Sequence, residues 1–317
     1  MVSSVGDVYT SYADTEYTES FNELINGKYE GIGCTIQQTE EEIKVISIYD
    51  GGPADKAGLK VNDIIKSVDE YDANEMGATA LSEYIKNEAT NDINIVVYRD
   101  GEEISFNLIR DEVEIPVVES KVINDNDAKI GYLKISIFSS VSSNQFEKRL
   151  EELEKENIDS LIIDVRDNNG GYLSSVTDIV SYLMPKGDVI YKIQKNDNIE
   201  SVKDKTTTKR EYPIAVLVNG NSASASEILA GAIKDSYGGF VVGNTTYGKG
   251  TVQQVKKLSD GSMIKYTVEN WLTPNGTWID GEGIVPTHLV DLDQEYYENP
   301  TDENDKQLKK AIELVSN

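Results

Sequence analysis

Histidine, cysteine and long apolar runs are nearly absent from this chain of 317 residues. Its one histidine, His288, leaves a lysine as the strongest candidate base for a nucleophilic hydroxyl, and we expect no chemical role for His288 itself. Its one cysteine, Cys34, excludes an internal disulfide and a cysteine-based zinc cluster. No apolar run approaches the roughly 18 to 20 residues of a membrane helix, so we expect a soluble chain. No metal or cofactor is expected.

Basic residues are also scarce, with 30 Lys and Arg against 56 Asp and Glu, for a net charge of -26. Nucleic acid and anionic membrane surfaces would be repelled, so neither is an expected partner. The first residues carry neither the basic nor the apolar region of a signal peptide, although such a segment could have been removed.

Patterns along the chain divide it into four segments. Residues 1–27 include a short amphipathic helix at 17–25 and are too few to fold alone, so we expect them to pack on the larger core. Residues 28–112 alternate short β runs with turn signals, and residues 113–294 alternate strands with helices, which is typical of an α/β domain. Residues 295–305 are acidic and predict a solvated linker before a last helix at 306–314.

The second segment carries a candidate peptide site. Its glycine-rich loop at 31–33 could turn backbone N–H groups toward a carboxylate, or be an ordinary tight turn. Alternate residues of the following strand could line a groove against a helix at 78–86, to which an extended peptide would add as a strand. The residues expected at this site are Ile32, Gly33, Cys34, Ile36, Leu81 and Ile85.

A serine-rich turn follows the apolar strand at 213–218 and precedes a predicted helix at 225–233. A hydroxyl there, such as that of Ser224, lies beside the amides of a helix N-terminus, which suits an oxyanion. The alternative is that Ser222, Ser224 and Ser226 only cap the helix.

Two further motifs complete the candidate site. Lys249 lies between two glycines, and as a general base it would need a pKa lowered by desolvation from about 10.4. If the strand that follows starts at Lys249, Gln253 projects from the same face and could orient the amine; the alternative is a solvated turn. Gly170 and Gly171 follow a buried-type strand and are candidate oxyanion donors.

These motifs carry two resemblances. Gly31-Ile32-Gly33, Val45-Ile46-Ser47-Ile48 and residues 52–65 (GPADKAGLKVNDII) together resemble a bacterial PDZ domain, a class that binds C-terminal peptide tails. The segments DVRDNNGG at 164–171, NSASASE at 221–227 and GKGTVQ at 248–253 resemble the C-terminal processing peptidases, also called tail-specific proteases. The second resemblance extends from Gly6 to Leu308.

The family resemblance implies a crotonase-like α/β fold with an inserted PDZ domain and serine endopeptidase activity near the C-terminus of proteins. Carried onto this chain, it implies Ser224 as nucleophile, Lys249 as general base and Gln253 as the residue that positions the lysine. The amide of Ala225 would join one glycine of the 170–171 pair in the oxyanion hole. The family resemblance also implies substrates with a free C-terminus, a possible homodimer and an extracytoplasmic location.

The sequence also allows two other functions to be considered, and it allows two roles for Arg99. A catalytically silent PDZ adaptor would lack Ser224, Lys249 or Gln253, and all three are present. An acyl-CoA enzyme of crotonase type would have no use for the PDZ-like segment. Arg99 could couple a bound tail to the catalytic domain, or could form a surface ion pair with Asp100 or Glu102.

Overall fold

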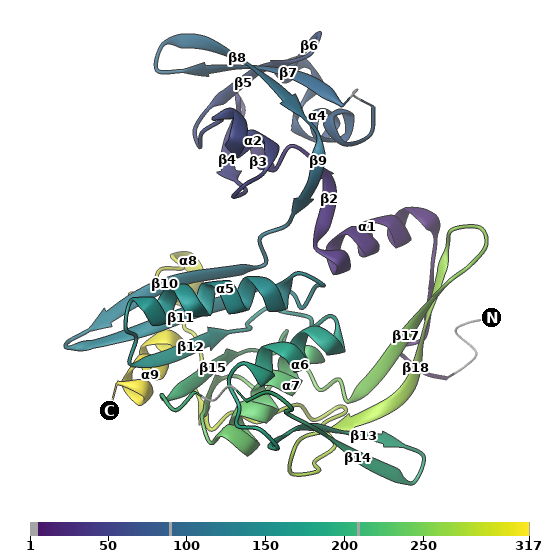
Figure 1. Cartoon of the computed structure of the whole chain (residues 1–317), viewed down its shortest axis with the longest axis vertical. Coiled ribbons are helices and arrows are strands. Elements are labelled where there is room, and N and C mark those ends of the chain that lie inside the picture. The colour runs from purple at the N-terminus through teal and green to yellow at the C-terminus, as the bar shows by residue number, and fades with distance from the viewer. Residues whose placement is uncertain (1–5, 89–90, 208–209, 317) are drawn as a thin grey trace. The chain divides into compact units, whose positions relative to one another are not determined.

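The computed structural model describes residues 6–88, 91–207 and 210–316. The chain forms two units (Figure 1). One is Gly27–Pro116, and the other combines Met1–Asn26 with Val117–Asn317. The larger unit therefore contains both ends of the chain, and the smaller one is inserted between them. No helix among the described residues has the length and apolar character needed to cross a membrane.

The central sheet of the larger unit has the strand order β10-β11-β12-β15-β16-β19. All its neighbouring strands are parallel except β10 and β11, which are antiparallel. Every residue of β12 and β15 is buried, as expected for parallel strands covered on both faces. The strands are β10 (Val118–Asp125), β11 (Ala128–Ile135), β12 (Ser160–Asp164), β15 (Ile214–Val218), β16 (Phe240–Gly243) and β19 (His288–Leu289).

Helices cover both faces of this sheet. Helices α5 (Ser142–Lys155), α6 (Leu173–Ser181) and α7 (Ala225–Ala232) pack against one another in sequence, and the π-helical turn η3 (Ile233–Tyr237) extends α7. Helix α9 (Lys306–Val315) buries Leu308, Ala311 and Val315 against alternate residues of the strands, including Ile162 and Leu217. Because side chains alternate between faces, α9 covers the face opposite the one that buries Leu161 and Ile163.

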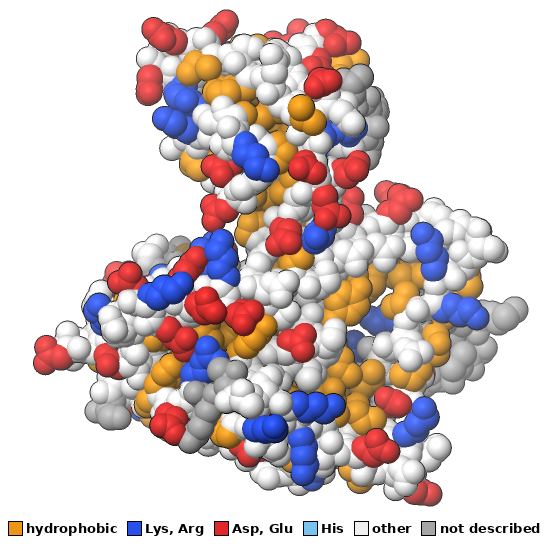
Figure 2. Space-filling view, viewed as in Figure 1, with side chains coloured by type: hydrophobic (Ala, Val, Ile, Leu, Met, Phe, Trp, Pro, Cys, Tyr) orange, Lys and Arg blue, Asp and Glu red, His pale blue; other side chains and the backbone are white. Residues whose placement is uncertain are grey.

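A second sheet lies beside the serine turn. Its order is β1-β18-β13-β14, and β17 pairs with β18 in a long hairpin (Figure 1). The N-terminal segment enters this sheet as β1 (Ser11–Ala13), continues as α1 (Thr15–Asn26) and is held by the Ser140 N–H, which donates to Ile25 O at 3.0 Å. The other strands are β13 (Val189–Lys195), β14 (Asn198–Lys203), β17 (Thr251–Lys257) and β18 (Met263–Leu272). Orange hydrophobic side chains line a hollow beside this hairpin (Figure 2).

The smaller unit is a sheet of order β3-β4-β5-β7-β8, with β6 on β5, packed on short helices. Its chain enters through β2 and leaves through β9, which pair with each other. Acidic side chains are prominent at the end where β6 and the β7–β8 turn lie (Figure 2). The strands are β2 (Lys28–Gly31), β3 (Cys34–Gln38), β4 (Ile43–Ile48), β5 (Ile64–Val68), β6 (Tyr71–Asp72), β7 (Asp92–Arg99), β8 (Glu102–Ile109) and β9 (Asp111–Glu114). The helical elements are α2 (Pro53–Ala57), α3 (Ala73–Met76), α4 (Ala78–Glu83) and η2 (Tyr84–Glu88).

The acidic stretch 295–305 corrects one expectation. It contains most of a short helix, α8 (Gln294–Glu298), and its last residue, Asp305, is buried in an ion pair with Arg166. The prediction of a solvated linker was therefore wrong for this end of the segment. The buried guanidinium of Arg166, from a distant loop, compensates the charge of the Asp305 carboxylate. The residues next to Asp305 in the sequence do not indicate this partner.

Candidate active site

Ser224 lies at the turn between β15 and α7, in a backbone conformation that is unusual for any residue other than glycine. Its φ is 55° and its ψ is -111°. Such a conformation costs about 1 to 3 kcal/mol and persists only where the surrounding structure enforces it. The turn therefore stores strain at the residue that the sequence proposed as nucleophile.

The neighbouring serines are occupied by structural hydrogen bonds. Ser222 Oγ donates to Val165 O at 2.8 Å, and Ser226 Oγ donates to Asn168 O at 2.8 Å. Both side chains are completely buried, whereas Ser224 is partly exposed. Of the three hydroxyls, the one of Ser224 is thus the one presented at the surface of the turn.

The loop after β12 packs directly against Ser224. A Cβ atom placed on Gly170, whose φ is 101°, would lie 2.9 Å from Ser224 Cβ and 2.8 Å from Ala223 O, so no side chain fits there. The Gly170 N–H donates to Asn168 Oδ1 at 2.8 Å. Within the described part of the chain, the N–H groups of Gly171 and Ala225 have no hydrogen-bond partner. These two amides are therefore available to an oxyanion beside Ser224.

Lys249 is largely enclosed and has a strongly perturbed amine. Burial and then the charge of Lys265 lower the pKa of Lys249 from 10.5 to about 8, against the opposing effect of Glu227 and Asp7. The Tyr9 ring covers the amine, with 5.3 Å from Nζ to the ring centroid. The Nζ atom makes no hydrogen bond or ion pair with any residue that the structure describes. Lys249 therefore has a substantial neutral fraction near pH 8.

The carboxylate of Glu227 joins the serine turn to the lysine segment. Its Oε2 accepts the N–H groups of Ser224 at 2.8 Å and Lys249 at 2.9 Å. Its Oε1 accepts Thr246 Oγ1 at 2.6 Å and the Gly248 N–H at 2.7 Å. Burial raises the pKa of Glu227, and the four donors oppose that rise. One fully buried carboxylate thus fixes the two segments that carry the candidate dyad.

Gln253 has a different partner from the one expected. Strand β17 begins at Thr251, after Lys249, so the two-residue period does not extend back to the lysine. The Gln253 amide donates to Thr251 Oγ1 at 2.6 Å, and no hydrogen bond joins it to Lys249 in the described ranges. Its role in orienting the lysine stays a prediction.

The sequence reasoning missed Glu227, Tyr9 and Lys265. Glu227 could have been found, because a glutamate three residues after a serine at a helix start is the pattern of a capping box. Tyr9 and Lys265 left no local signal. They reach Lys249 because β1 and β17 both pair with β18, which brings distant segments together.

In the smaller unit, the candidate peptide-binding residues surround the start of β3. Gly33 has a φ of 76°, and its carbonyl accepts the Tyr49 N–H at 2.9 Å. Ile32, Leu81 and Ile85 are buried in the core of the unit, and Cys34 and Ile36 pack partly exposed on that core. Leu81 has no exposed surface, so Cys34 and Ile36 are the better placed of these side chains to meet a peptide. Burial raises the pKa of Cys34 to about 12, which keeps its thiol protonated.

Arg99 and His288 each make a contact that the sequence did not predict. Arg99 donates from Nε to Asp63 Oδ1 and from Nη2 to Asp63 Oδ2, both at 2.6 Å, and Asp63 is 1% exposed. The alternative of a surface ion pair with Asp100 or Glu102 was therefore wrong, because a buried carboxylate at the start of the neighbouring strand offers a bidentate contact. The His288 ring packs on Phe240, with 5.8 Å between centroids.

A family model described as peptidase family S41 matches residues 129–290, which is just over half of the chain, and a PDZ domain model matches residues 31–109. The chain belongs to peptidase family S41. The predicted family and the α/β fold with a PDZ domain are thereby confirmed.

Relatives of this S41 chain include two curated proteins and one solved structure. The carboxy-terminal processing protease CtpB of Bacillus subtilis (strain 168) is 35% identical over 322 residues, covering 100% of this chain and 66% of that protein. The probable CtpA-like serine protease of Staphylococcus aureus (strain COL) is 32% identical over 297 residues, covering 92% and 58%. The photosystem II D1 C-terminal processing protease is 28% identical, with a TM-score of 0.56, covering 92% and 80%. The chain spans less than two thirds of the length of the two curated relatives.

Proposed function

We propose that this chain is a serine endopeptidase that cleaves proteins near their C-terminus, with Ser224 as nucleophile and Lys249 as general base. The observation that carries this proposal is the Glu227 carboxylate, whose Oε2 accepts the N–H groups of both residues. The names of the relatives, which describe C-terminal processing proteases, support the same substrate class.

The chemistry follows from the described groups. The neutral Lys249 amine accepts the Ser224 hydroxyl proton as Oγ bonds to the scissile carbonyl carbon. The negative oxygen that forms accepts hydrogen bonds from the free amides of Gly171 and Ala225. The Gly170 N–H already donates to Asn168, and the absence of a side chain on Gly170 lets its backbone lie close to Ser224. The ammonium returns its proton to the leaving amine, and water then attacks the acyl-enzyme by the same route in reverse.

The PDZ domain supplies a reason for preferring tails. An extended C-terminal segment would add to the edge of β3, with its carboxylate at the loop that contains Ile32 and Gly33 and its side chains against Cys34 and Ile36. Gating through Arg99, assembly into a homodimer and an extracytoplasmic location stay predictions.

A protein substrate with an unstructured tail tests the proposal. We expect the purified chain to shorten this substrate near its C-terminus, as mapped by mass spectrometry, and Ser224→Ala to abolish cleavage while leaving tail binding intact. A substrate whose terminal carboxylate is amidated is the matched control and should be cut more slowly. Tail binding without cleavage by the unmodified chain would identify an adaptor and overturn the enzymatic proposal.

A further inference from the structure

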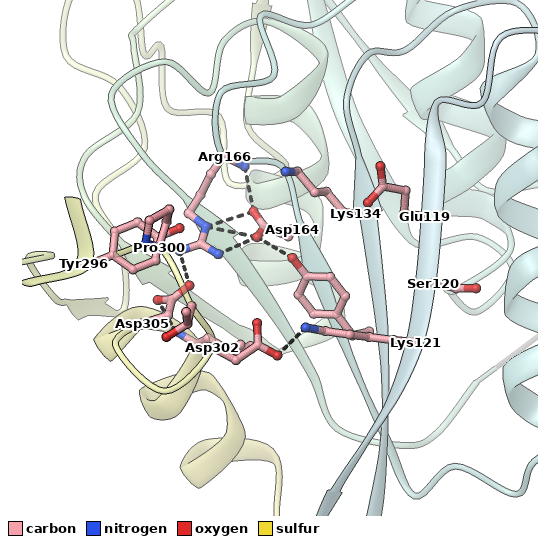
Figure 3. Close-up of a pocket in the computed structure, with 13 residues that line it drawn as sticks. Glu119, Ser120, Lys121, Lys134, Asp164, Arg166, Tyr296, Pro300, Asp302 and Asp305 are labelled. Carbon is pink, nitrogen blue, oxygen red and sulfur yellow. Dashed lines mark hydrogen bonds and ion pairs between the residues drawn. The ribbon is translucent and has the colours of Figure 1, made fainter. Parts of the chain in front are cut away.

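Arg166 lies on the loop between the β12 strand and the Gly170–Gly171 pair, and two carboxylates enclose its guanidinium (Figure 3). Asp164 accepts from Nε at 3.0 Å with each of its oxygens and from Nη2 at 2.6 Å. Asp305 pairs with Nη1 at 2.8 Å. The side chains of Arg166, Asp164 and Asp305 are 10%, 2% and 4% exposed, so the charges depend on one another rather than on water.

Asp305 belongs to the other end of the chain. It is the N-cap of α9, where its Oδ1 accepts the Leu308 N–H at 2.9 Å. Gln307, on the first turn of α9, accepts from Arg166 Nη1 at 3.1 Å and donates to Val290 O at 2.8 Å. The guanidinium is therefore bound to the start of a helix that is itself anchored on the central sheet.

The same loop is bound to the serine turn on its other side. Asp167 Oδ1 accepts the side-chain amides of Asn219 at 2.9 Å and Asn221 at 2.8 Å. The carbonyl of Asn168 accepts the Ala223 N–H at 3.0 Å, and its side-chain oxygen accepts the Gly170 N–H at 2.8 Å. Residues 166–170 thus connect the start of α9 to the backbone beside Ser224.

A cavity adjoins the guanidinium. Its volume is about 250 Å³, and Lys134, Asp164, Tyr296, Asp305 and Leu308 are among the side chains that line it with Arg166 (Figure 3). If the contact with Asp305 were lost, the guanidinium would have space on that side into which it could move. The contact with Asp305 is therefore one of the restraints on the position of Arg166.

We propose that Arg166 and Asp305 are positioning residues, through which helix α9 holds the loop that presents the Gly171 amide to the reacting carbonyl. This inference rests on the proposed peptidase function. A donor displaced by about 1 Å from a developing oxyanion typically costs on the order of 100-fold in rate while substrate binding is kept. The effect of Asp305 should therefore fall on kcat and not on KM.

Asp305→Asn is the decisive variant, because asparagine also caps helices well and keeps an oxygen for the Leu308 N–H while removing the charge. Asp293→Asn is its matched control. Asp293 is the N-cap of α8 and pairs with Lys306 at 2.5 Å, but it makes no contact with Arg166 among the described residues. We expect Asp305→Asn to lower kcat for a tail substrate by about 10- to 100-fold with KM within twofold. We expect Asp293→Asn to leave both constants unchanged.

Hydrogen exchange separates this inference from the proposed function. Amides of residues 166–171 should exchange faster in Asp305→Asn than in Asp293→Asn, whether or not the chain cleaves any substrate tried. Equal exchange, or equal kcat in the two folded variants, would overturn the positioning role. If Asp305→Asn does not fold, Arg166→Lys replaces it, since lysine keeps a cation between the aspartates but loses the bidentate fork. An unchanged kcat in that variant would also overturn the proposal.

Discussion

The pKa of Lys249 predicts the pH dependence of peptide cleavage. With a pKa of about 8, roughly 10% of the amine is neutral at pH 7 and about 90% at pH 9. Because only the neutral amine accepts the Ser224 proton, kcat/KM should rise about tenfold between these pH values and then level. A lysine of ordinary pKa would give a rise of about 100-fold over the same interval, without a plateau.

Removing the charge of Lys265 should move this profile. After burial, the charge of Lys265 is the largest cause of the lowered pKa of Lys249. The carboxylates of Glu227 on α7 and Asp7 on the N-terminal segment oppose this lowering, and the Tyr9 ring covers the amine. A partly screened charge pair is worth about 1 kcal/mol, which is equivalent to about 0.7 pH unit. We therefore expect Lys265→Met to shift the rising limb toward higher pH by about that amount.

The assay is kcat/KM between pH 6 and 10 on a peptide with no group that titrates in this range, with products separated by chromatography. Lys256→Met is the control, because Lys256 lies exposed on the same hairpin. A limb that does not move in Lys265→Met, or that moves equally in Lys256→Met, would refute the electrostatic reasoning. A tenfold rise that persists in Lys249→Ala would refute the lysine base itself.

Three further predictions concern stability and the Glu227 contact. Ser224→Gly should unfold at higher urea concentration than Ser224→Ala, by about 1 kcal/mol in free energy, because glycine relieves the positive φ at a cost in unfolded-state entropy; equal stability would argue against strain at the turn. Glu227→Gln places an amide donor among four donors, so we expect about 2 to 3 kcal/mol of destabilisation and a large fall in kcat, both measurable on the purified variant. Wild-type values would contradict the role of the Glu227 carboxylate in holding the two segments together. Lys249→Met should raise the free energy of unfolding at pH 7 by about 1 to 3 kcal/mol, because the lowered pKa of Lys249 disfavours its ammonium form in the folded chain below pH 8. This gain should vanish as the pH approaches 10.5, and a gain that does not depend on pH would contradict the lowered pKa.

Local pattern was sufficient to place the serine turn. An apolar run, a polar turn and a run of good helix formers predicted the strand, turn and helix that became β15, Ser224 and α7. The glycine pair after β12 was predictable for the same reason, since α/β sites form where parallel strands end. Both features depend on neighbours in sequence or on a rule of sheet topology.

Long-range partners were not predictable in this way. The pairs Arg99 with Asp63 and Arg166 with Asp305 join charged residues whose sequence neighbours offered other partners. Burial decides between such partners, because a desolvated carboxylate needs a cation much more than an exposed one does. Burial at these positions depends on how the sheets assemble, so the spacing of apolar residues along the sequence does not predict it.

Three unfavourable features meet at the candidate site. Ser224 has a backbone conformation that costs about 1 to 3 kcal/mol, and a pKa of about 8 means that the Lys249 ammonium has lost about 3 kcal/mol of stability. Glu227 is a carboxylate with no exposure to solvent. The first two could each be relieved by one substitution, Ser224 to glycine and Lys249 to methionine, without changing the fold class. All three features fit the proposed peptidase, in which the Glu227 carboxylate connects the nucleophile to its base, because packing alone would favour relief of the strain at Ser224 and of the lowered pKa at Lys249.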